Sequence, residues 1–191
     1  MTKIKICGIT SLKEIEIMNE IIPDYIGFVF ANGRHKISIE TARFLKKNIN
    51  KDIKVVGVFF NEKIEKVKDI YQSGIIDFVQ LHGTESNLYI DSLKKENVPI
   101  INRINDVINN INTEYYMLDS GSGSGITLNW DDLIIKNHNK LFIAGGIDTS
   151  NLLNVINKTN PYAVDISTGA ELNGLKNKKI VSKLVNLAHY N

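Results

Sequence analysis

The sequence predicts an α/β protein, a (β/α)8 TIM barrel formed by a single domain over residues 1–191. Short β-branched apolar runs alternate with helix-like segments along the chain, without a linker or a low-complexity stretch between them. This alternation implies parallel strands with right-handed crossovers, and eight such units can close into a barrel. The chain is short beside the roughly 250 residues typical of a barrel. A doubly wound sheet that binds a dinucleotide is disfavoured, because no G-x-G-x-x-G motif follows the first run.

Eight runs have the composition of buried strands. In chain order they are KIKIC from Lys3, YIGFVF from Tyr25, KVVGVFF from Lys54, IDFVQL from Ile76, VPIINRI from Val98, YYMLD from Tyr115, LFIAGG from Leu141 and YAVDIS from Tyr162.

Helix start signals lie between these runs. The clearest is the capping box Ser11-x-x-Glu14, which is followed by apolar residues at helical spacing. Asn61 is expected to cap a helix that ends at Gly74. Further helices are expected after Thr84 and Thr149, and weaker, Asn-rich ones after Arg103 and Trp130.

Composition excludes several classes of function. The net charge is only +2 and the lysines are scattered, so the electrostatic footprint of a nucleic-acid-binding protein is missing. A single cysteine cannot form an internal disulfide, which fits a reducing compartment. The chain does not begin like a signal peptide, and no apolar run approaches membrane-spanning length. We therefore expect a cytoplasmic enzyme or binding protein that acts on a small molecule, without nucleic-acid or membrane partners.

Small residues at two strand ends predict an anion site. In a (β/α)8 barrel the carboxyl ends of all strands lie at one rim, where active sites form. AGGID at residues 144–148 and DISTGAE at residues 165–171 follow the seventh and eighth runs. Glycines let backbone N–H groups approach an anion, and a following helix N-terminus adds partial positive charge. We expect a phosphate site, contacted mainly through backbone because neither loop has a Lys or Arg, at Gly145, Gly146, Ser167, Thr168 and Gly169.

Asp119 ends the sixth run and precedes a loop of alternating Gly and Ser within LDSGSGSGITLNW, residues 118–130. The loop could be a flexible linker, and Asp119 alone could be a helix cap or a solvated charge. A linker between packed elements of a compact domain serves no purpose, so an active-site flap beside Asp119 is favoured. We expect Gly123, Ser124 and Gly125 to contact substrate.

Cys7 stands where the first run stops, directly before Gly8. A buried free cysteine is usually a small hydrophobic residue. A reactive role for Cys7 requires a scaffold that brings it to an active site and partners elsewhere in the chain.

Seven segments occur together in an order that resembles one enzyme family. They are KICGIT, GFVF, VGVFFN, VQLHGTE, LDSGSGSG with the later NW, AGGI and VDISTGAE. From Lys3 to Lys179 the chain resembles phosphoribosylanthranilate isomerase of tryptophan biosynthesis. The resemblance implies a (β/α)8 barrel without a metal or an organic cofactor. The sequence leaves monomer and homodimer open. It also implies an Amadori rearrangement of N-(5-phosphoribosyl)anthranilate to 1-(2-carboxyphenylamino)-1-deoxyribulose 5-phosphate.

The resemblance assigns the two proton-transfer groups. Cys7 matches the general base and Asp119 the general acid. The base must be a thiolate, so surroundings that lower the thiol pKa are expected, whereas the acid must keep its proton near neutral pH.

The resemblance also assigns substrate contacts. Arg34 matches the residue that holds the anthranilate carboxylate, with Lys36 as the alternative because this loop differs in length from the commoner pattern. Gln80 and His82 match a family motif, as substrate contacts or as structural residues. Asp165 either contacts the ribose hydroxyls or braces the rim. Thr168 stands where serine is commoner, and it keeps the hydroxyl.

Two other functions remain open at this stage. A different sugar-phosphate isomerase or lyase would explain the two small-residue loops but not Cys7, Asp119 and Arg34 together. A non-catalytic barrel that binds a phosphorylated ligand would be expected to have lost Cys7 or Asp119, and both are present.

Overall fold

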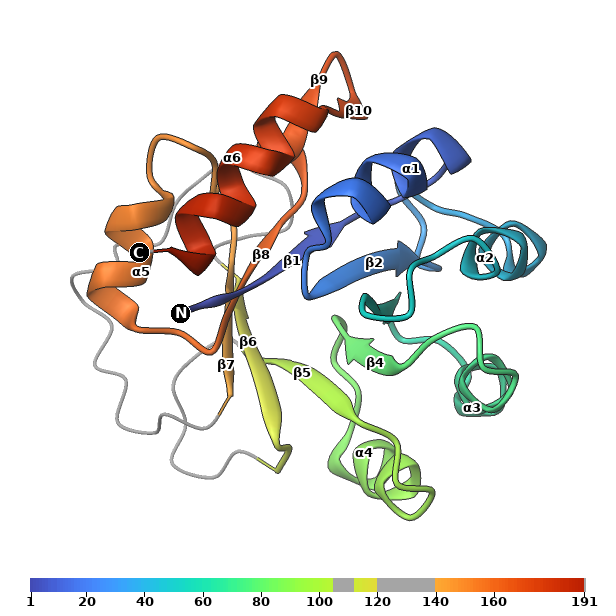
Figure 1. The fold of residues 1–191 in the computed structure, drawn as a ribbon. Helices are drawn as coiled ribbons and strands as arrows, with labels where there is room; N and C mark the ends of the chain where they lie inside the picture. Colours follow the sequence, from blue (N-terminus) through green and yellow to red (C-terminus); the bar gives the residue numbers. More distant parts are fainter. Residues whose placement is uncertain (105–111, 120–139, 191) are drawn as a thin grey trace.

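A computed structural model describes residues 1–104, 112–119 and 140–190. Its parallel strands form a closed barrel in the order β1 to β8, which confirms the predicted fold class (Figure 1). Each strand lies inside one of the runs expected from the sequence. They are β1 (Lys3–Cys7), β2 (Tyr25–Val29), β3 (Lys54–Phe59), β4 (Phe78–Leu81), β5 (Ile100–Ile104), β6 (Tyr115–Asp119), β7 (Leu141–Ala144) and β8 (Ala163–Ile166).

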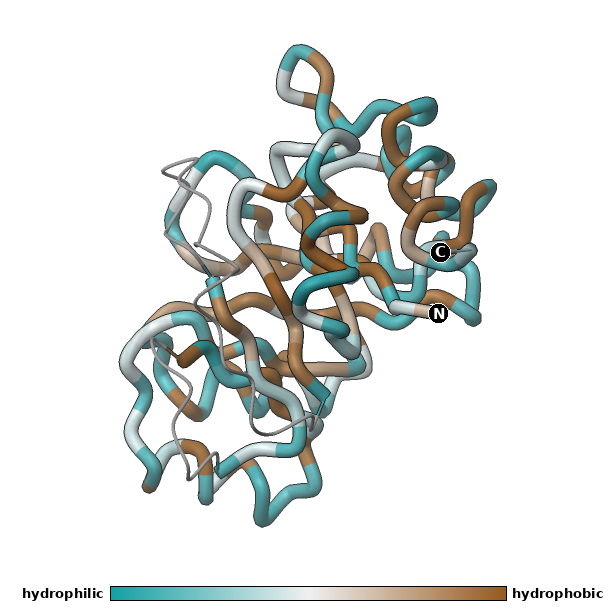
Figure 2. The backbone as a smooth tube through the Cα atoms, turned by 90° about the vertical axis from the view of Figure 1, so that its left-hand side faces the viewer, coloured by the Kyte–Doolittle hydropathy of each residue, from teal (hydrophilic) through white to brown (hydrophobic). Residues whose placement is uncertain are grey.

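Helices surround the barrel. They are α1 (Leu12–Ile21), α2 (Ile39–Lys46), α3 (Ile64–Gln72), α4 (Asn87–Lys94), α5 (Leu152–Thr159) and α6 (Lys178–His189). Brown, hydrophobic stretches run along the central strands in Figure 2, whereas teal, hydrophilic stretches concentrate in peripheral turns. In the part of the chain that the structure describes, no helix is long and apolar enough to cross a membrane.

The described helices that the sequence predicts start where expected, except for the cap of α3. The capping box of α1 is confirmed, because the Ser11 hydroxyl accepts the Glu14 N–H at 3.4 Å. Asn61 does not cap α3, because its side-chain oxygen accepts the Thr84 N–H at 2.8 Å and Lys63 takes the N-cap position. The helices expected after Thr84 and Thr149 are present as α4 and α5, with Ser86 and Asn151 at their N-cap positions. The helices α2 and α6 begin after Ser38 and Asn177. The helices expected after Arg103 and Trp130 lie outside the described residues.

Alternation along β1 sends its side chains to two different environments. Ile4 and Ile6 belong to the layer between barrel and helices. Lys3, Lys5 and Cys7 point into the barrel, where side chains from all strands meet. Residues two apart on one strand therefore occupy successive levels of the same interior.

Five aromatic side chains close the amino-terminal end of the barrel, and we call them the aromatic floor: Tyr25, Phe78, Tyr115, Phe142 and Tyr162. The rings of Tyr25 and Phe78 lie edge to face with their centroids 5.6 Å apart, as aromatic pairs prefer. The Lys3 ammonium lies 5.2 Å from the Tyr162 ring centroid. Since this end is filled, the opposite end is the place for a site.

A small hairpin after β8 was not expected from the sequence. A single 3-10 turn, η2 (Thr168–Ala170), leads into β9 (Glu171–Leu172), which pairs antiparallel with β10 (Leu175–Lys176) beside the start of α6 (Figure 1). The Lys176 N–H donates to Glu14 of the capping box at 3.2 Å. The start of α1 therefore anchors the hairpin.

Candidate active site

A cavity of about 800 Å³ opens at the carboxyl ends of the strands. Eleven of the predicted site residues line it: Cys7, Arg34, Gln80, His82, Asp119, Gly145, Gly146, Asp165, Ser167, Thr168 and Gly169. They come from loops and strands spread over the whole chain, and Cys7 and Asp119 face one cavity, as expected. Gly123, Ser124 and Gly125 lie outside the described residues.

Cys7 owes its position to a glycine on the neighbouring strand. Cys7 pairs with Gly27 of β2, and a Cβ on Gly27 would lie 2.6 Å from the Cys7 sulfur. Any larger residue at position 27 would therefore displace the thiol. The expectation of a lowered thiol pKa is wrong, because burial raises the pKa of Cys7 although Lys5 and Lys176 oppose this shift.

A buried ion pair lies one level below Cys7. The Lys5 ammonium, fully excluded from solvent, donates to Asp165 Oδ2 at 2.9 Å. Burial alone would lower the pKa of Lys5, but Asp165 and Cys7 reverse the effect and raise it. Asp165 Oδ1 is buried and finds no hydrogen-bond partner among the described residues. Since Asp165 lines the cavity, this oxygen is an acceptor available to a ligand.

Asp119 is linked to the two polar residues of β4 and its loop. His82 Nε2 lies 3.2 Å from Asp119 Oδ2, and Gln80 Nε2 lies 3.2 Å from His82 Nδ1. With the Gln80 amide donating to Nδ1, a neutral His82 carries its proton on Nε2 and donates it to Asp119. The arrangement fixes the orientation of a mostly buried carboxyl group at the cavity wall.

Arg34 is the better placed of the two cations proposed for carboxylate binding. It lines the cavity, whereas Lys36 is not among the described lining residues and donates to Asn32 at 2.7 Å. The Arg34 guanidinium is exposed and pairs with Glu171 of the hairpin. Glu171 also accepts from Lys176 at 2.7 Å, so the hairpin holds the Arg34 loop.

The loops after β7 and β8 meet as the phosphate prediction requires. Gly145 and Gly146 adopt φ values of 100° and 61°, which favour glycine. A Cβ on Gly169 would lie 2.0 Å from the Ile147 carbonyl oxygen, so the two loops touch. Lys176, which belongs to the hairpin rather than to either loop, supports the second loop by donating to the Ser167 carbonyl at 3.1 Å.

Sequence reasoning missed Lys5, Gly27 and Lys176. The signal for Lys5 was present, because the alternation of β1 that directs Cys7 inward directs Lys5 inward as well. Gly27 and Lys176 matter through contacts with Cys7 and with Ser167, 20 and nine residues away in the chain. No local pattern announces such contacts.

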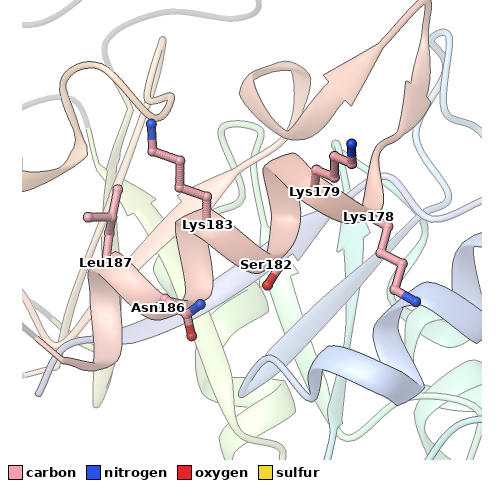
Figure 3. A pocket seen from close by; sticks show the side chains of 6 residues that line it. All are labelled: Lys178, Lys179, Ser182, Lys183, Asn186 and Leu187. Carbon is pink, nitrogen blue, oxygen red and sulfur yellow. The ribbon is translucent and has the colours of Figure 1, made fainter.

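Other parts of the described chain offer no second chemical centre. A shallow depression on the outer face of α6 is lined by Lys178, Lys179, Ser182, Lys183, Asn186 and Leu187 (Figure 3). Its lining has no carboxylate, histidine or thiol, and Lys178 pairs with Glu20. Within residues 1–104, 112–119 and 140–190, no three His, Cys, Asp or Glu side chains gather as a metal site would need.

Comparison with known proteins decides the family. A family model described as N-(5'phosphoribosyl)anthranilate (PRA) isomerase matches residues 4–187. The chain belongs to the N-(5'-phosphoribosyl)anthranilate isomerase family. As a member of it, the chain is an enzyme, an isomerase of tryptophan biosynthesis.

Relatives within the isomerase family match along nearly their whole length. The isomerase of Endomicrobium trichonymphae is 36% identical over 197 residues, covering 98% of each chain. That of Clostridium acetobutylicum is 37% identical over 199 residues, covering 97% of each. The crystal structure of the Thermotoga maritima isomerase aligns over 100% of both chains with a TM-score of 0.89 and 29% identity. A further solved isomerase, with a TM-score of 0.84 and 28% identity over 100% of both chains, holds reduced 1-(o-carboxyphenylamino)-1-deoxyribulose 5-phosphate.

Proposed function

We propose that the chain converts N-(5'-phosphoribosyl)anthranilate to 1-(2-carboxyphenylamino)-1-deoxyribulose 5-phosphate, with Cys7 and Asp119 as the groups that move protons. The observation that carries the proposal is the single cavity shared by Cys7, Asp119, Arg34 and the two small-residue loops. The substrate presents a carboxylate, a ribose and a phosphate. The cavity offers a guanidinium, a buried carboxylate oxygen and glycine-rich backbone for these three groups.

Asp119 acts first, as the general acid. Its carboxyl proton moves to the ribose ring oxygen, the bond between this oxygen and C1 breaks, and the anthranilate nitrogen supplies electrons to form an iminium ion. His82 donates to Asp119 Oδ2 and so keeps the carboxyl group oriented towards the cavity. A positioned acid of this kind typically contributes about a hundredfold to ten-thousandfold in rate.

Cys7 acts second, as the general base. Its thiolate takes the C2 proton, the C–H electrons form a C1–C2 double bond, and the iminium nitrogen becomes neutral. The resulting enolamine gives up its hydroxyl proton and gains a proton at C1, which yields the ketone. The rearrangement needs no oxidant or reductant, because C1 is reduced as C2 is oxidised. Solvent exchange returns a proton to Asp119 and removes one from Cys7.

The remaining residues hold the substrate. Arg34 binds the anthranilate carboxylate, for which a planar guanidinium is suited. Asp165 Oδ1 accepts a hydrogen bond from a ribose hydroxyl, and Gln80 positions His82. Backbone N–H groups bind the phosphate at Gly145, Gly146, Ser167, Thr168 and Gly169. Contacts from Gly123, Ser124 and Gly125 stay predictions.

We extend the proposal to organisation and location. The chain acts as one catalytic domain over residues 1–191, a monomer or a homodimer in the cytoplasm, with a small phosphorylated molecule as its partner and without nucleic acid or membrane. Support comes from the continuous barrel β1 to β8, the single cysteine and the small net charge.

The test is to mix purified protein with freshly prepared N-(5'-phosphoribosyl)anthranilate and to follow the loss of its fluorescence. We expect turnover by the unaltered protein and none above background by Asp119→Asn. Binding without turnover would instead favour the non-catalytic phosphate-binding barrel. Turnover of another sugar phosphate alone would favour a different isomerase.

A further inference from the structure

Lys5 is the most deeply buried cation in the barrel interior that the proposed chemistry leaves without a task. It has no exposed surface and makes one ion pair, with Asp165 of β8 across the register pair Lys5–Asp165. Burying two charges incurs a desolvation penalty of several kcal/mol per ion, and a well-packed apolar pair often stabilises a fold equally well. The aromatic floor one level below fills the same interior with apolar rings. Stability alone is therefore a weak reason for this ion pair.

The charged groups around Cys7 single out Lys5. Lys5 lies two residues before Cys7 on the same inward face of β1, and Asp165 lies on β8, which pairs with β1. Lys5 and Lys176 both oppose the rise in the pKa of Cys7, and Lys5 does so more strongly. The strand on the other side of Cys7 supplies only Gly27, which brings no charge. The Lys176 ammonium is already engaged by Glu171 and by the Ser167 carbonyl, at 2.7 and 3.1 Å.

We propose that Lys5 is the positioning residue that makes Cys7 usable as a base: its ammonium, anchored by Asp165, is the counter-charge of the Cys7 thiolate inside the barrel. The inference deepens the proposed function and rests on it, since it takes Cys7 to be the base. Lys5 keeps its proton throughout and does not touch the substrate. The thiol proton leaves to solvent through the cavity, and the thiolate that remains is held beside the ammonium.

The single cysteine makes the proposal directly testable. A thiol reagent modifies Cys7 alone, so the pH dependence of alkylation by iodoacetamide reports the titration of this one group without an isomerase assay. The unaltered protein is compared with Lys5→Met over a range from about pH 6 to about pH 10. An opposite charge within about 4–6 Å typically moves a pKa by one to three units. We expect Lys5→Met to raise the alkylation midpoint by about one unit or more.

Lys3→Met is the matched control. Lys3 is the same residue type on the same strand and the same inward face, but it lies over the rings of Tyr25 and Tyr162. The substitution is expected to leave the alkylation midpoint and turnover unchanged. Lys5→Met is expected to lower kcat at least about tenfold while KM changes little, and Lys5→Arg, which keeps the charge, is expected to restore most of the midpoint shift.

Loss of Lys5 leaves Asp165 buried without its partner, so Lys5→Met is paired with a second variant. The double substitution Lys5→Met with Asp165→Asn removes both charges, and we expect it to remain folded in thermal unfolding. Asp165 itself raises the pKa of Cys7, so the double variant is compared with Asp165→Asn alone. A Lys5→Met midpoint that matches the unaltered protein, together with a double-variant midpoint that matches Asp165→Asn, would overturn the proposal and leave Lys5 a structural residue. A raised midpoint supports the coupling of Lys5 to Cys7 even if the unaltered protein shows no isomerase turnover. Absence of isomerase turnover in the unaltered protein would, by itself, reject the base role of Cys7.

Discussion

The two ends of the barrel are built from the same strands and have opposite characters. At the amino-terminal end, aromatic side chains from β2, β4, β6 and β7 pack edge to face in the barrel interior. At the carboxyl end, strands of the same barrel and the loops that follow them present glycines, carboxylates, a histidine and a thiol around about 800 Å³ of open space. On β7, Phe142 belongs to the floor, and Gly145 lies at the mouth three residues later. One short strand thus serves stability at its start and chemistry at its end.

The sharpest test of this division is Cys7→Ser at the mouth. The substitution is nearly isosteric but replaces the thiol with a much weaker acid, so a base role predicts a fall in kcat of about a hundredfold to ten-thousandfold. Thermal unfolding and the affinity for product are expected to stay close to those of the unaltered protein. Near-normal turnover by the serine variant would remove Cys7 from the mechanism.

The complementary test at the amino-terminal end of the barrel is Phe142→Ala in the aromatic floor. Phe142 is fully buried against Tyr25, Tyr115 and Tyr162. Truncation of a buried phenylalanine typically lowers the free energy of unfolding by about 3–5 kcal/mol. Denaturant unfolding measures this loss of stability. At a temperature where the variant is folded, kcat and KM should stay within about twofold of the unaltered values, because no floor residue reaches the cavity. A selective loss of kcat in the folded variant would break the division.

The contrast between the two ends also explains which structural features could be predicted from the sequence. The strands and α1 were predictable because short β-branched apolar runs and a capping box are local patterns. Asn61 was misassigned because its side chain caps the backbone of Thr84, a contact between loops that no local pattern encodes. The alternation of β1 places Lys5 inward, but its partner Asp165 lies 160 positions later, so the ion pair could not be predicted from the local sequence. The raised pKa of Cys7 follows from burial in the assembled barrel, which the sequence does not quantify.

A smaller effect is expected for Gly146→Val in the phosphate loop. Gly146 has φ 61°, so any side chain there strains the backbone by about 1–2 kcal/mol and also intrudes on the approach of an anion. Gly74→Val is the matched control, because Gly74 has φ 72° but a Cβ there would meet open space in a turn after α3. Both variants should lose similar stability. Only Gly146→Val should raise KM, by roughly tenfold or more, and weaken competition by inorganic phosphate. Equal KM values in the two variants would contradict the phosphate assignment.

The smallest effect is expected for Glu171 of the hairpin, a part of the mouth that also contributes to the stability of the fold. Burial would raise the pKa of Glu171, but Lys176, His35 and Arg34 outweigh it and lower the pKa below its usual 4.5. Because the folded-state pKa lies below that of the unfolded chain, the ionised carboxylate stabilises the fold above about pH 4.5, and this contribution is lost as the pH falls through the folded value.

We expect Glu171→Gln to lower the free energy of unfolding by about 1 kcal/mol or slightly more at pH 7, and the difference from the unaltered protein to shrink below pH 4.5. Glu20→Gln, which breaks the exposed pair with Lys178, should leave the unfolding free energy within about 0.5 kcal/mol at either pH. Denaturant unfolding at both pH values measures these differences. If Glu171→Gln lowers the free energy of unfolding equally in acid, packing rather than charge holds the hairpin against the Arg34 loop.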